Sequence, residues 1–231
     1  MARRAKAGAE PILVPAVCIP FCADIDMAGG RRMPSSVAVL GDLNILSTKT
    51  CALFCSLRCP GDVILRTLDL AVAMRSAGVT VISGFHTPVE KECLALLLRG
   101  EQPIVICPAR AIEAMRLPQA WAPRIDAGRI LLLSASPADQ RRPTNQTAAE
   151  RNHLVAALAT SVFVAYASPG GKTEKLVREV VAWGAPVFTF ATNACANLVE
   201  LGAQPVADDA AWIRDYLSLI HISEPTRQAE I

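Results

Sequence analysis

The stretch Ser161–Lys175, SVFVAYASPGGKTEK, decides the fold. It begins with apolar residues typical of a buried strand, breaks at Ser168–Gly171 and opens a helix at Lys172. A glycine-rich turn between a strand and a helix leaves backbone N–H groups pointing outward, and the helix dipole favours an anion there. A P-loop would need a glycine five positions before Gly171, where Tyr166 stands. The segment therefore predicts a phosphate-binding turn in a Rossmann-like setting, and it argues against an ATPase.

The chain on either side of this stretch alternates strand-like and helix-like segments. We expect strands at residues 51–57, 79–83, 103–107, 129–133, 161–167 and 186–189. We expect helices at residues 62–77, 88–99, 117–126, 148–159 and 173–183. Hydrophobic residues make up 52% of the chain and aromatic residues only 5%, as suits a parallel sheet buried on both faces. The pattern predicts an α/β fold with a doubly wound, mostly parallel Rossmann-like sheet flanked by helices.

Three regions follow from this pattern. Residues 1–34 are rich in proline, glycine and cysteine, and we expect an irregular N-terminal extension there. Residues 35–210 form the expected Rossmann-like domain. Residues 217–231, LSLIHISEPTRQAEI, look like the conceptual translation of a sequencing-library adapter, so we exclude them from the fold and give His221 no functional weight.

Charge and hydropathy narrow the class of protein. The formal net charge is +2, so any nucleic-acid binding has to come from a local cluster of cations. We find no apolar run of the roughly 20 residues that a membrane span needs. The basic N-terminus precedes an apolar stretch, but Pro11, Pro15 and Pro20 interrupt it, which argues against a signal peptide. We therefore expect a cytoplasmic protein with no membrane partner.

The eight cysteines raise the question of a metal site. Cys51, Cys55 and Cys59 are spaced by four residues, which would place three thiols on one face of a helix. The same segment is strand-like, however, and in a strand this spacing spans too far for one ion. The chain contains no Cys-x-x-Cys pair. We expect buried thiols that pack as small hydrophobic groups, with no metal and no cofactor.

The expected strand ends carry polar and basic residues. In a doubly wound sheet, ligands bind beyond the carboxyl ends of the strands. That rule brings together Arg58, the Ser83–Gly84 turn, Arg110 and the turn at residues 169–172 around one crevice.

Five segments between Val37 and Val206 resemble, in order, the DNA-processing protein A family. They are GDLNIL at residues 41–46, LFCSLRCP at 53–60, VISGF at 81–85, Arg-Asn at 151–152 and NLVELGA at 197–203. The chain departs from the family pattern at two places. Cys55 replaces the glycine of the first loop, and His-Thr-Pro at residues 86–88 replaces the family's Ala-Arg-Gly.

The resemblance implies binding of single-stranded DNA and loading of the recombinase RecA in natural transformation, without catalysis. It also implies a homodimer. Such binding requires a basic crevice that follows the phosphates and is largely independent of sequence. The candidate DNA- or phosphate-binding residues are Ser56, Arg58, Ser83, Gly84, Arg110, Arg151, Asn152, Gly170, Gly171, Lys172 and Thr173.

Two other functions remain open from the sequence. The first is a phosphoribohydrolase-like enzyme of the same superfamily, because residues 169–174 partly match its Pro-Gly-Gly-x-Gly-Thr-x-x-Glu motif. Here the carboxylate of Glu174 follows Thr173 directly, which turns it away from the face that the chemistry needs, and a favourable charge in the first helical turn is the simpler interpretation. The second is a non-catalytic nucleotide sensor. A crevice that carries only a few cations suits a ligand smaller than a DNA strand.

Overall fold

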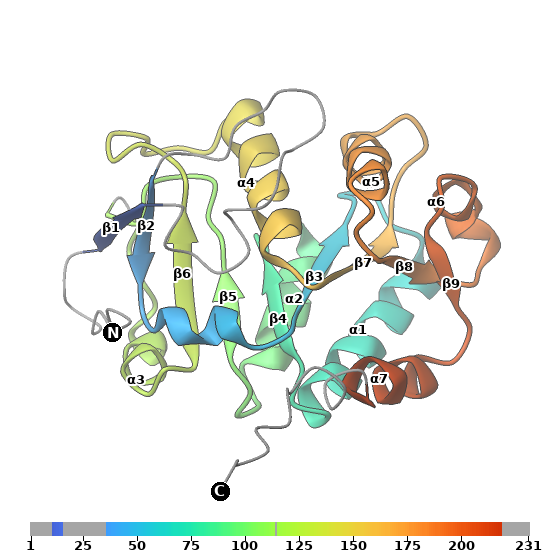
Figure 1. Cartoon of the computed structure of the whole chain (residues 1–231), viewed down its shortest axis with the longest axis horizontal. Helices are drawn as coiled ribbons and strands as arrows, with labels where there is room; N and C mark the ends of the chain where they lie inside the picture. Colours follow the sequence, from blue (N-terminus) through green and yellow to red (C-terminus); the bar gives the residue numbers. More distant parts are fainter. Residues whose placement is uncertain (1–10, 16–35, 114, 219–231) are drawn as a thin grey trace, which may run out of the picture.

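The computed structural model describes residues 11–15, 36–113 and 115–218. The described strands form one sheet in the order β1-β2-β6-β5-β4-β3-β7-β8-β9 (Figure 1). Their bounds are β1 Ile12–Pro15, β2 Ser36–Leu40, β3 Thr50–Cys55, β4 Thr80–Ser83, β5 Ile104–Ile106, β6 Ile130–Ser134, β7 Ser161–Tyr166, β8 Val187–Phe190 and β9 Gln204–Val206.

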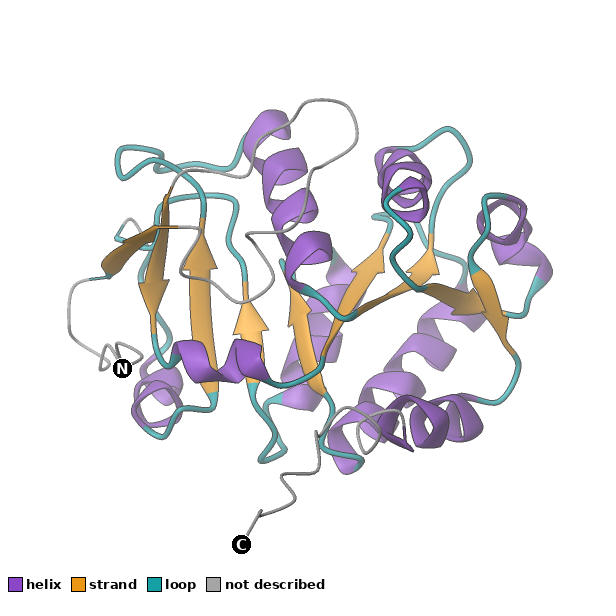
Figure 2. Cartoon of the chain, in the orientation of Figure 1, coloured by secondary structure: helices purple, strands orange, loops and turns teal. Residues whose placement is uncertain are grey.

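Helices cover both faces of this sheet (Figure 2). One layer holds α1, α2 and α7, which pack against one another through α1, and the other holds α4, α5 and α6. The α-helices are α1 Gly61–Ser76, α2 Pro88–Leu97, α3 Ala122–Asp126, α4 Asn145–Leu158, α5 Lys172–Ala182, α6 Ala196–Glu200 and α7 Asp209–Ser218. The short 3-10 helices are η2 Leu43–Ser47, η3 Gln119–Trp121 and η4 Asn193–Cys195. No described helix has the length and apolar character needed to cross a bilayer.

The chain winds in two directions from the centre of the sheet. From β3 it runs outward through β4, β5 and β6, and it then returns to place β7 on the other side of β3. Every pair from β6 through to β9 is parallel, including β3 with β7. The predicted doubly wound α/β fold is confirmed. The reversal of strand order puts a topological switch point between the carboxyl ends of β3 and β7, where ligands bind in such sheets.

The core lies on both faces of the central strands. Every residue of β3 and of β6 is buried, which explains why these strands read as continuous apolar runs instead of alternating ones. Phe163 of β7 packs edge-on against Phe190 of β8 and against Trp212 of α7, each at 5.0 Å between ring centroids. These contacts join the sheet to the α7 layer.

The edges of the sheet differ from the sequence-based expectation. Ile12–Pro15 forms β1 inside the stretch expected to be irregular, pairing antiparallel with β2, which pairs antiparallel with β6. Such short strands carry little pattern of their own and depend on a neighbour for their hydrogen bonds. At the other end, α7 carries the packed core past residue 210 to Tyr216. Residues 1–10 and 16–34 of the expected extension, and residues 219–231 of the suspected adapter segment, lie outside the described residues.

Candidate functional site

The loops that follow β3 and β7 meet at the switch point, and Ser56 joins them. Its backbone N–H donates to the Tyr166 carbonyl at 2.9 Å. Its hydroxyl oxygen accepts from the backbone N–H of Ser168 at 3.2 Å and lies 3.1 Å from the Thr173 hydroxyl oxygen. Two predicted site residues, Ser56 and Thr173, are thus brought together although they are 117 positions apart. These hydrogen bonds fix the loop after β3 relative to the loop after β7. The site residues that follow the two strands therefore keep a fixed distance from one another.

The glycine turn before α5 already has internal partners. Gly170 adopts a φ of +69°, and its N–H donates to Glu174 Oε2 at 3.2 Å. The N–H of Gly171 donates to the Ser168 carbonyl at 2.9 Å. The same Glu174 oxygen accepts from Asn197 Nδ2 at 2.7 Å. The chain's own carboxylate therefore occupies the N-terminal end of α5, where a helix favours negative charge.

Lys172 and Asn152 lie on either side of a small hollow between α4 and α5. The hollow measures about 220 Å³, and Lys175 also lines it. Lys172 Nζ donates to Asn145 Oδ1 at 2.7 Å, which links the start of α5 to the start of α4. The ammonium groups of Lys172 and Lys175 belong to exposed side chains, so they remain accessible to an anion.

Arg58 is exposed on the β3–α1 loop, beside a shallow hollow of about 500 Å³. Leu57, which is 71% exposed, and the half-buried ring of Tyr166 line the same hollow. The other lining residues are Cys59, Pro60, Ile64, Pro88 and Val89. A cation thus stands next to an apolar and aromatic surface, a combination suited to a phosphate with its adjoining base.

Arg151 is buried beneath the turn that ends β4. It is only 7% exposed, and its Nη1 donates to the Cys107 carbonyl at 3.1 Å. A Cβ on Gly84 would lie 1.2 Å from Nη1, so the guanidinium fills the space that the glycine leaves. Burial lowers the pKa of Arg151 from its usual value. Its predicted role as a direct DNA contact stays a prediction. Ser83, also predicted, is fully buried, and its hydroxyl accepts from the Phe85 N–H at 3.2 Å.

Glu90 fixes the loop before α2. Its carboxylate accepts from the backbone N–H groups of Cys55 at 3.1 Å, His86 at 2.8 Å and Thr87 at 3.2 Å. Thr87 Oγ1 accepts from the Glu90 N–H at 3.3 Å, which completes a capping box. Glu90 therefore ties the carboxyl end of β3 to the loop after β4.

Arg110 lies farther along the same edge of the sheet, in the loop after β5. It is half-buried, and its carbonyl accepts from the Ser134 hydroxyl at 2.8 Å. Since β4 separates β5 from β3, Arg110 stands apart from the switch point. The predicted residues thus form a switch-point group, a buried group at Gly84, and outlying positions at Arg110 and Asn152.

The buried thiols pack in the core. Burial raises the pKa of Cys51, Cys93 and Cys107 to about 12, so these side chains remain protonated at neutral pH. Among the described residues, no group of His, Cys, Asp or Glu is arranged to hold a metal ion.

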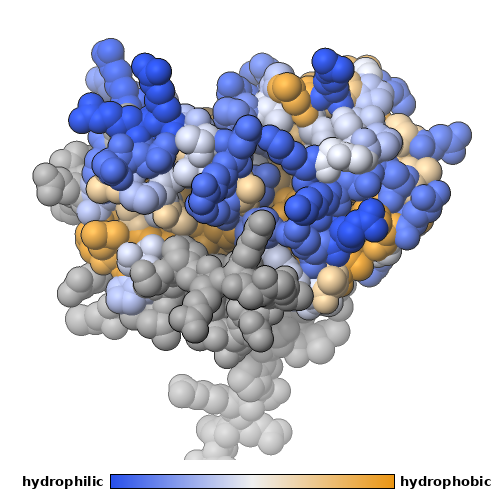
Figure 3. Space-filling view, turned by 90° about the horizontal axis from the view of Figure 1, so that it is seen from above, coloured by the Kyte–Doolittle hydropathy of each residue, from blue (hydrophilic) through white to orange (hydrophobic). Residues whose placement is uncertain are grey.

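Sequence reasoning missed four contributors to this edge. They are Tyr166 as a wall of the Arg58 hollow, Asn145 as the partner of Lys172, Lys175, and Asn197 as a partner of Glu174. Of these four residues, only Tyr166 could have been found from the local sequence, because it is an aromatic residue at the end of a strand. Figure 3 views this edge from above, and hydrophilic residues cover most of the described surface there.

The family model for DNA recombination-mediator protein A matches residues 25–217. The chain belongs to the DNA recombination-mediator protein A family. The resemblance found in the sequence is confirmed, and the chain is a member of a family of DNA-processing recombination mediators. No curated relative matches the sequence.

Solved structures agree with this family fold. The DNA processing protein A of Helicobacter pylori, described as binding single-stranded DNA, is 20% identical with a TM-score of 0.74 over 94% of this chain and 100% of that one. DNA processing protein A of Streptococcus pneumoniae is 17% identical with a TM-score of 0.70, over 91% of this chain and 74% of that one. The molybdenum cofactor carrier protein of Chlamydomonas reinhardtii is more distant, 13% identical with a TM-score of 0.52 over 75% of this chain and 99% of its own. At these identities the likeness shows the fold alone.

Proposed function

We propose that this member of the DNA recombination-mediator protein A family binds single-stranded DNA along the carboxyl-end edge of its sheet. The observation that carries the proposal is the switch-point crevice, where exposed Arg58 stands beside an apolar hollow and exposed Lys172 begins α5, the helix that follows β7. The single-stranded DNA binding described for the Helicobacter pylori protein supports it.

Cations carry the phosphate contacts in this proposal. Arg58, Lys172 and Lys175 are exposed, and each phosphate that they neutralise releases condensed counterions. The N–H groups of Gly170 and Gly171 have partners within the turn, so a phosphate reaches Gly170 only by displacing the carboxylate of Glu174. Glu174 therefore opposes anion binding at the turn.

The hollow beside Arg58 supplies the surface for a base. Leu57 and the Tyr166 ring are apolar and accessible, and stacking on such surfaces is tolerant of base identity. The affinity for DNA then depends on salt concentration more than on the base sequence of the DNA.

The rest of the proposed function rests on family membership. We propose that the chain acts without catalysis, in the cytoplasm, as a homodimer and together with the recombinase RecA. The carboxylate of Glu174 is held by Gly170 and Asn197, which gives no support to the phosphoribohydrolase-like role.

The test is the binding of fluorescent oligo-dT across a range of salt concentrations, with AMP as competitor. We expect affinity to fall steeply with salt, and Arg58→Ala and Lys172→Ala each to weaken binding and lower the salt slope by about one. Glu174→Gln removes the competing charge and is expected to tighten binding severalfold, with exposed Glu92→Gln as the matched control.

Oligo-dT binding that is unchanged in Arg58→Ala, Lys172→Ala and Glu174→Gln would contradict the assignment of the crevice as the DNA site. Tight AMP binding without oligo-dT binding would instead establish the nucleotide-sensor alternative.

A further inference from the structure

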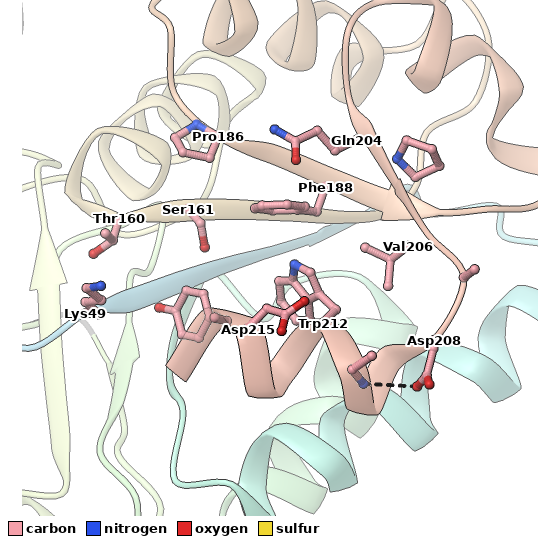
Figure 4. Close-up of a pocket in the computed structure, with 14 residues that line it drawn as sticks. Lys49, Thr160, Ser161, Pro186, Phe188, Gln204, Val206, Asp208, Trp212 and Asp215 are labelled. Carbon is pink, nitrogen blue, oxygen red and sulfur yellow. Dashed lines mark hydrogen bonds between the residues drawn. The ribbon is translucent and has the colours of Figure 1, made fainter. Parts of the chain in front are cut away.

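Two hollows outside the Arg58 crevice differ in the charges that line them. The larger, of about 540 Å³, lies between α7 and strands β8 and β9 (Figure 4). Two carboxylates, those of Asp208 and Asp215, line it against one ammonium group, that of Lys49. Such a surplus of negative charge repels phosphate groups. A nucleic acid strand is therefore expected to avoid this hollow.

The smaller hollow, of about 220 Å³, lies between α4 and α5 and has the opposite balance of charge. Lys172 and Lys175 line it, and Glu179 contributes the one carboxylate among its lining residues. His153 of α4 is the remaining titratable residue of the lining. The net charge of this α4–α5 hollow therefore depends on whether the imidazole of His153 carries one proton or two.

The side chain of His153 is 9% exposed, and each of its ring nitrogens contacts an oxygen atom. Nδ1 lies 2.7 Å from the carbonyl oxygen of Ala149, one turn earlier in α4, and Nε2 lies 2.5 Å from Oε2 of Glu179 on α5. A carbonyl oxygen and an ionised carboxylate accept hydrogen bonds and do not donate them. A neutral imidazole has one N–H, so both contacts are hydrogen bonds only when both ring nitrogens carry a proton.

The elements that pack against α4 leave Glu179 as the negative charge that faces His153. These elements include α5, β3 and β4. The two strands contain no Asp, Glu, Lys, Arg or His. Burial raises the pKa of the thiols of Cys51 and Cys55 in β3, which keeps them neutral. The charged groups that face the imidazole from α5 are Glu179 and the two lysines of the hollow.

The charged residues next to His153 within α4 have partners of their own. Glu150 Oε1 accepts from Gln146 Nε2 at 2.9 Å, and Arg151 Nη1 donates to the Cys107 carbonyl at 3.1 Å. The ionic partner of His153 is therefore Glu179, on the neighbouring helix.

Loss of one proton changes this contact. Histidine is the side chain that changes charge between about pH 5 and 8. A deprotonated Nε2 is an acceptor, so two acceptors then face each other in a poorly hydrated contact, and the attachment of α5 to α4 weakens. The positive groups that line the hollow fall from three to two, against one carboxylate. A phosphate at the hollow is therefore attracted less strongly.

We propose that the His153–Glu179 pair is a proton switch that regulates the binding of DNA phosphate at the α4–α5 hollow. At low pH the doubly protonated imidazole joins the two helices and adds positive charge beside Lys172 and Lys175. At higher pH the proton on Nε2 passes to water, and the affinity of the hollow for phosphate falls. This inference rests on the proposed function, in which the two lysines contact phosphate.

Nitrogen-15 NMR of the imidazole rings in the full chain tests the switch without DNA. The signals of His153 are those that are absent from His153→Gln. We expect both ring nitrogens to carry protons at pH 6, and Nδ1 alone to carry one at pH 8.5, because the Ala149 carbonyl retains its donor. A ring that stays in one charge state from pH 6 to 8.5 would overturn the proposal, and so would a neutral ring with its proton on Nε2.

Binding of fluorescent oligo-dT at pH 6 and pH 8.5, at one salt concentration, tests the regulation. We expect the wild-type affinity to be about threefold higher at pH 6, the size expected for one added charge near a phosphate in water. His153→Gln keeps a donor for Glu179 but does not titrate, so the difference should disappear. His86→Gln, at an exposed position in the loop after β4, is the matched control and should keep it.

This inference and the proposed function fail in different ways. Oligo-dT that binds equally at both pH values, or a difference that persists in His153→Gln, overturns the switch and leaves the DNA site in place. Absence of oligo-dT binding at either pH contradicts the proposed function, and the switch with it. The near-ultraviolet circular dichroism of His153→Gln is compared with that of the wild type, so that a changed affinity is not mistaken for unfolding.

Discussion

At the scale of single residues, Arg151 packs against Gly84. The guanidinium lies where any side chain at position 84 would have to sit. Its Nη1 donates to the Cys107 carbonyl, and the nearby carboxylate of Glu90 partly offsets the desolvation of its charge. The φ of Gly84 lies outside the left-handed region, so its backbone conformation does not require a glycine. The close approach of the Arg151 guanidinium is what requires one.

Gly84→Ala should therefore destabilise the protein. The added methyl group would push Arg151 away from its carbonyl partner and leave a buried charge poorly paired, at a cost of about 2–4 kcal/mol in the free energy of unfolding. Urea denaturation followed by circular dichroism measures the loss. Gly61→Ala at the start of α1 is the control, because a Cβ there meets nothing within 4 Å. Equal stability of the two variants would contradict this packing.

At the scale of elements, α7 completes the fold on one face. Trp212, Ile213 and Tyr216 are buried against the sheet, and Arg66 of α1 pairs with Asp209 at the start of α7 at 2.9 Å. The helix therefore belongs to the packed domain and closes the core over β8.

Trp212→Ala is expected to cost about 3–5 kcal/mol of stability, because it removes a large ring packed against Phe163 and Phe188. Arg214→Ala, at an exposed position of the same helix, should change stability by less than about 0.5 kcal/mol. Thermal or urea denaturation distinguishes the two. A small effect of Trp212→Ala would mean that α7 is dispensable to the core.

At the scale of the whole molecule, the core contains thiols that resist ionisation. Cys51, Cys93 and Cys107 have a pKa raised by burial from 9.0 to about 12. Their protonated form is the one that the folded state stabilises. The stabilisation is complete below pH 9 and is lost as pH rises toward 12, because the unfolded thiols ionise first.

The free energy of unfolding should thus fall as pH rises above about 9, by up to about 1.4 kcal/mol per thiol per pH unit. Urea denaturation at pH 7, 9 and 10 under reducing conditions measures the slope. Cys107→Ala removes one of these thiols and should make the slope shallower. A stability independent of pH over this range would show that the thiols ionise equally in both states.

The candidate site was only partly predictable from sequence. The glycine turn, Arg58 and Lys172 are visible because they follow apolar strands within a few residues, so local pattern is enough to place them. The sequence cannot reveal that Gly170 donates to Glu174, since the N-terminal charge of a helix favours an external anion and an internal carboxylate alike.

By itself the sequence determined the alternation of strands and helices, and with it the parallel sheet, because backbone preference and apolar periodicity act over short distances. Only the tertiary structure decided the strands at the two ends of the sheet, β1 with its neighbour β2 and β9, because a strand there forms only when an adjacent strand supplies its hydrogen bonds. It also decided that Arg151 is buried against Gly84 and that Ser161 meets Tyr216. Such contacts join residues far apart in the chain, and their energy comes from burial that exists only once the layers have packed.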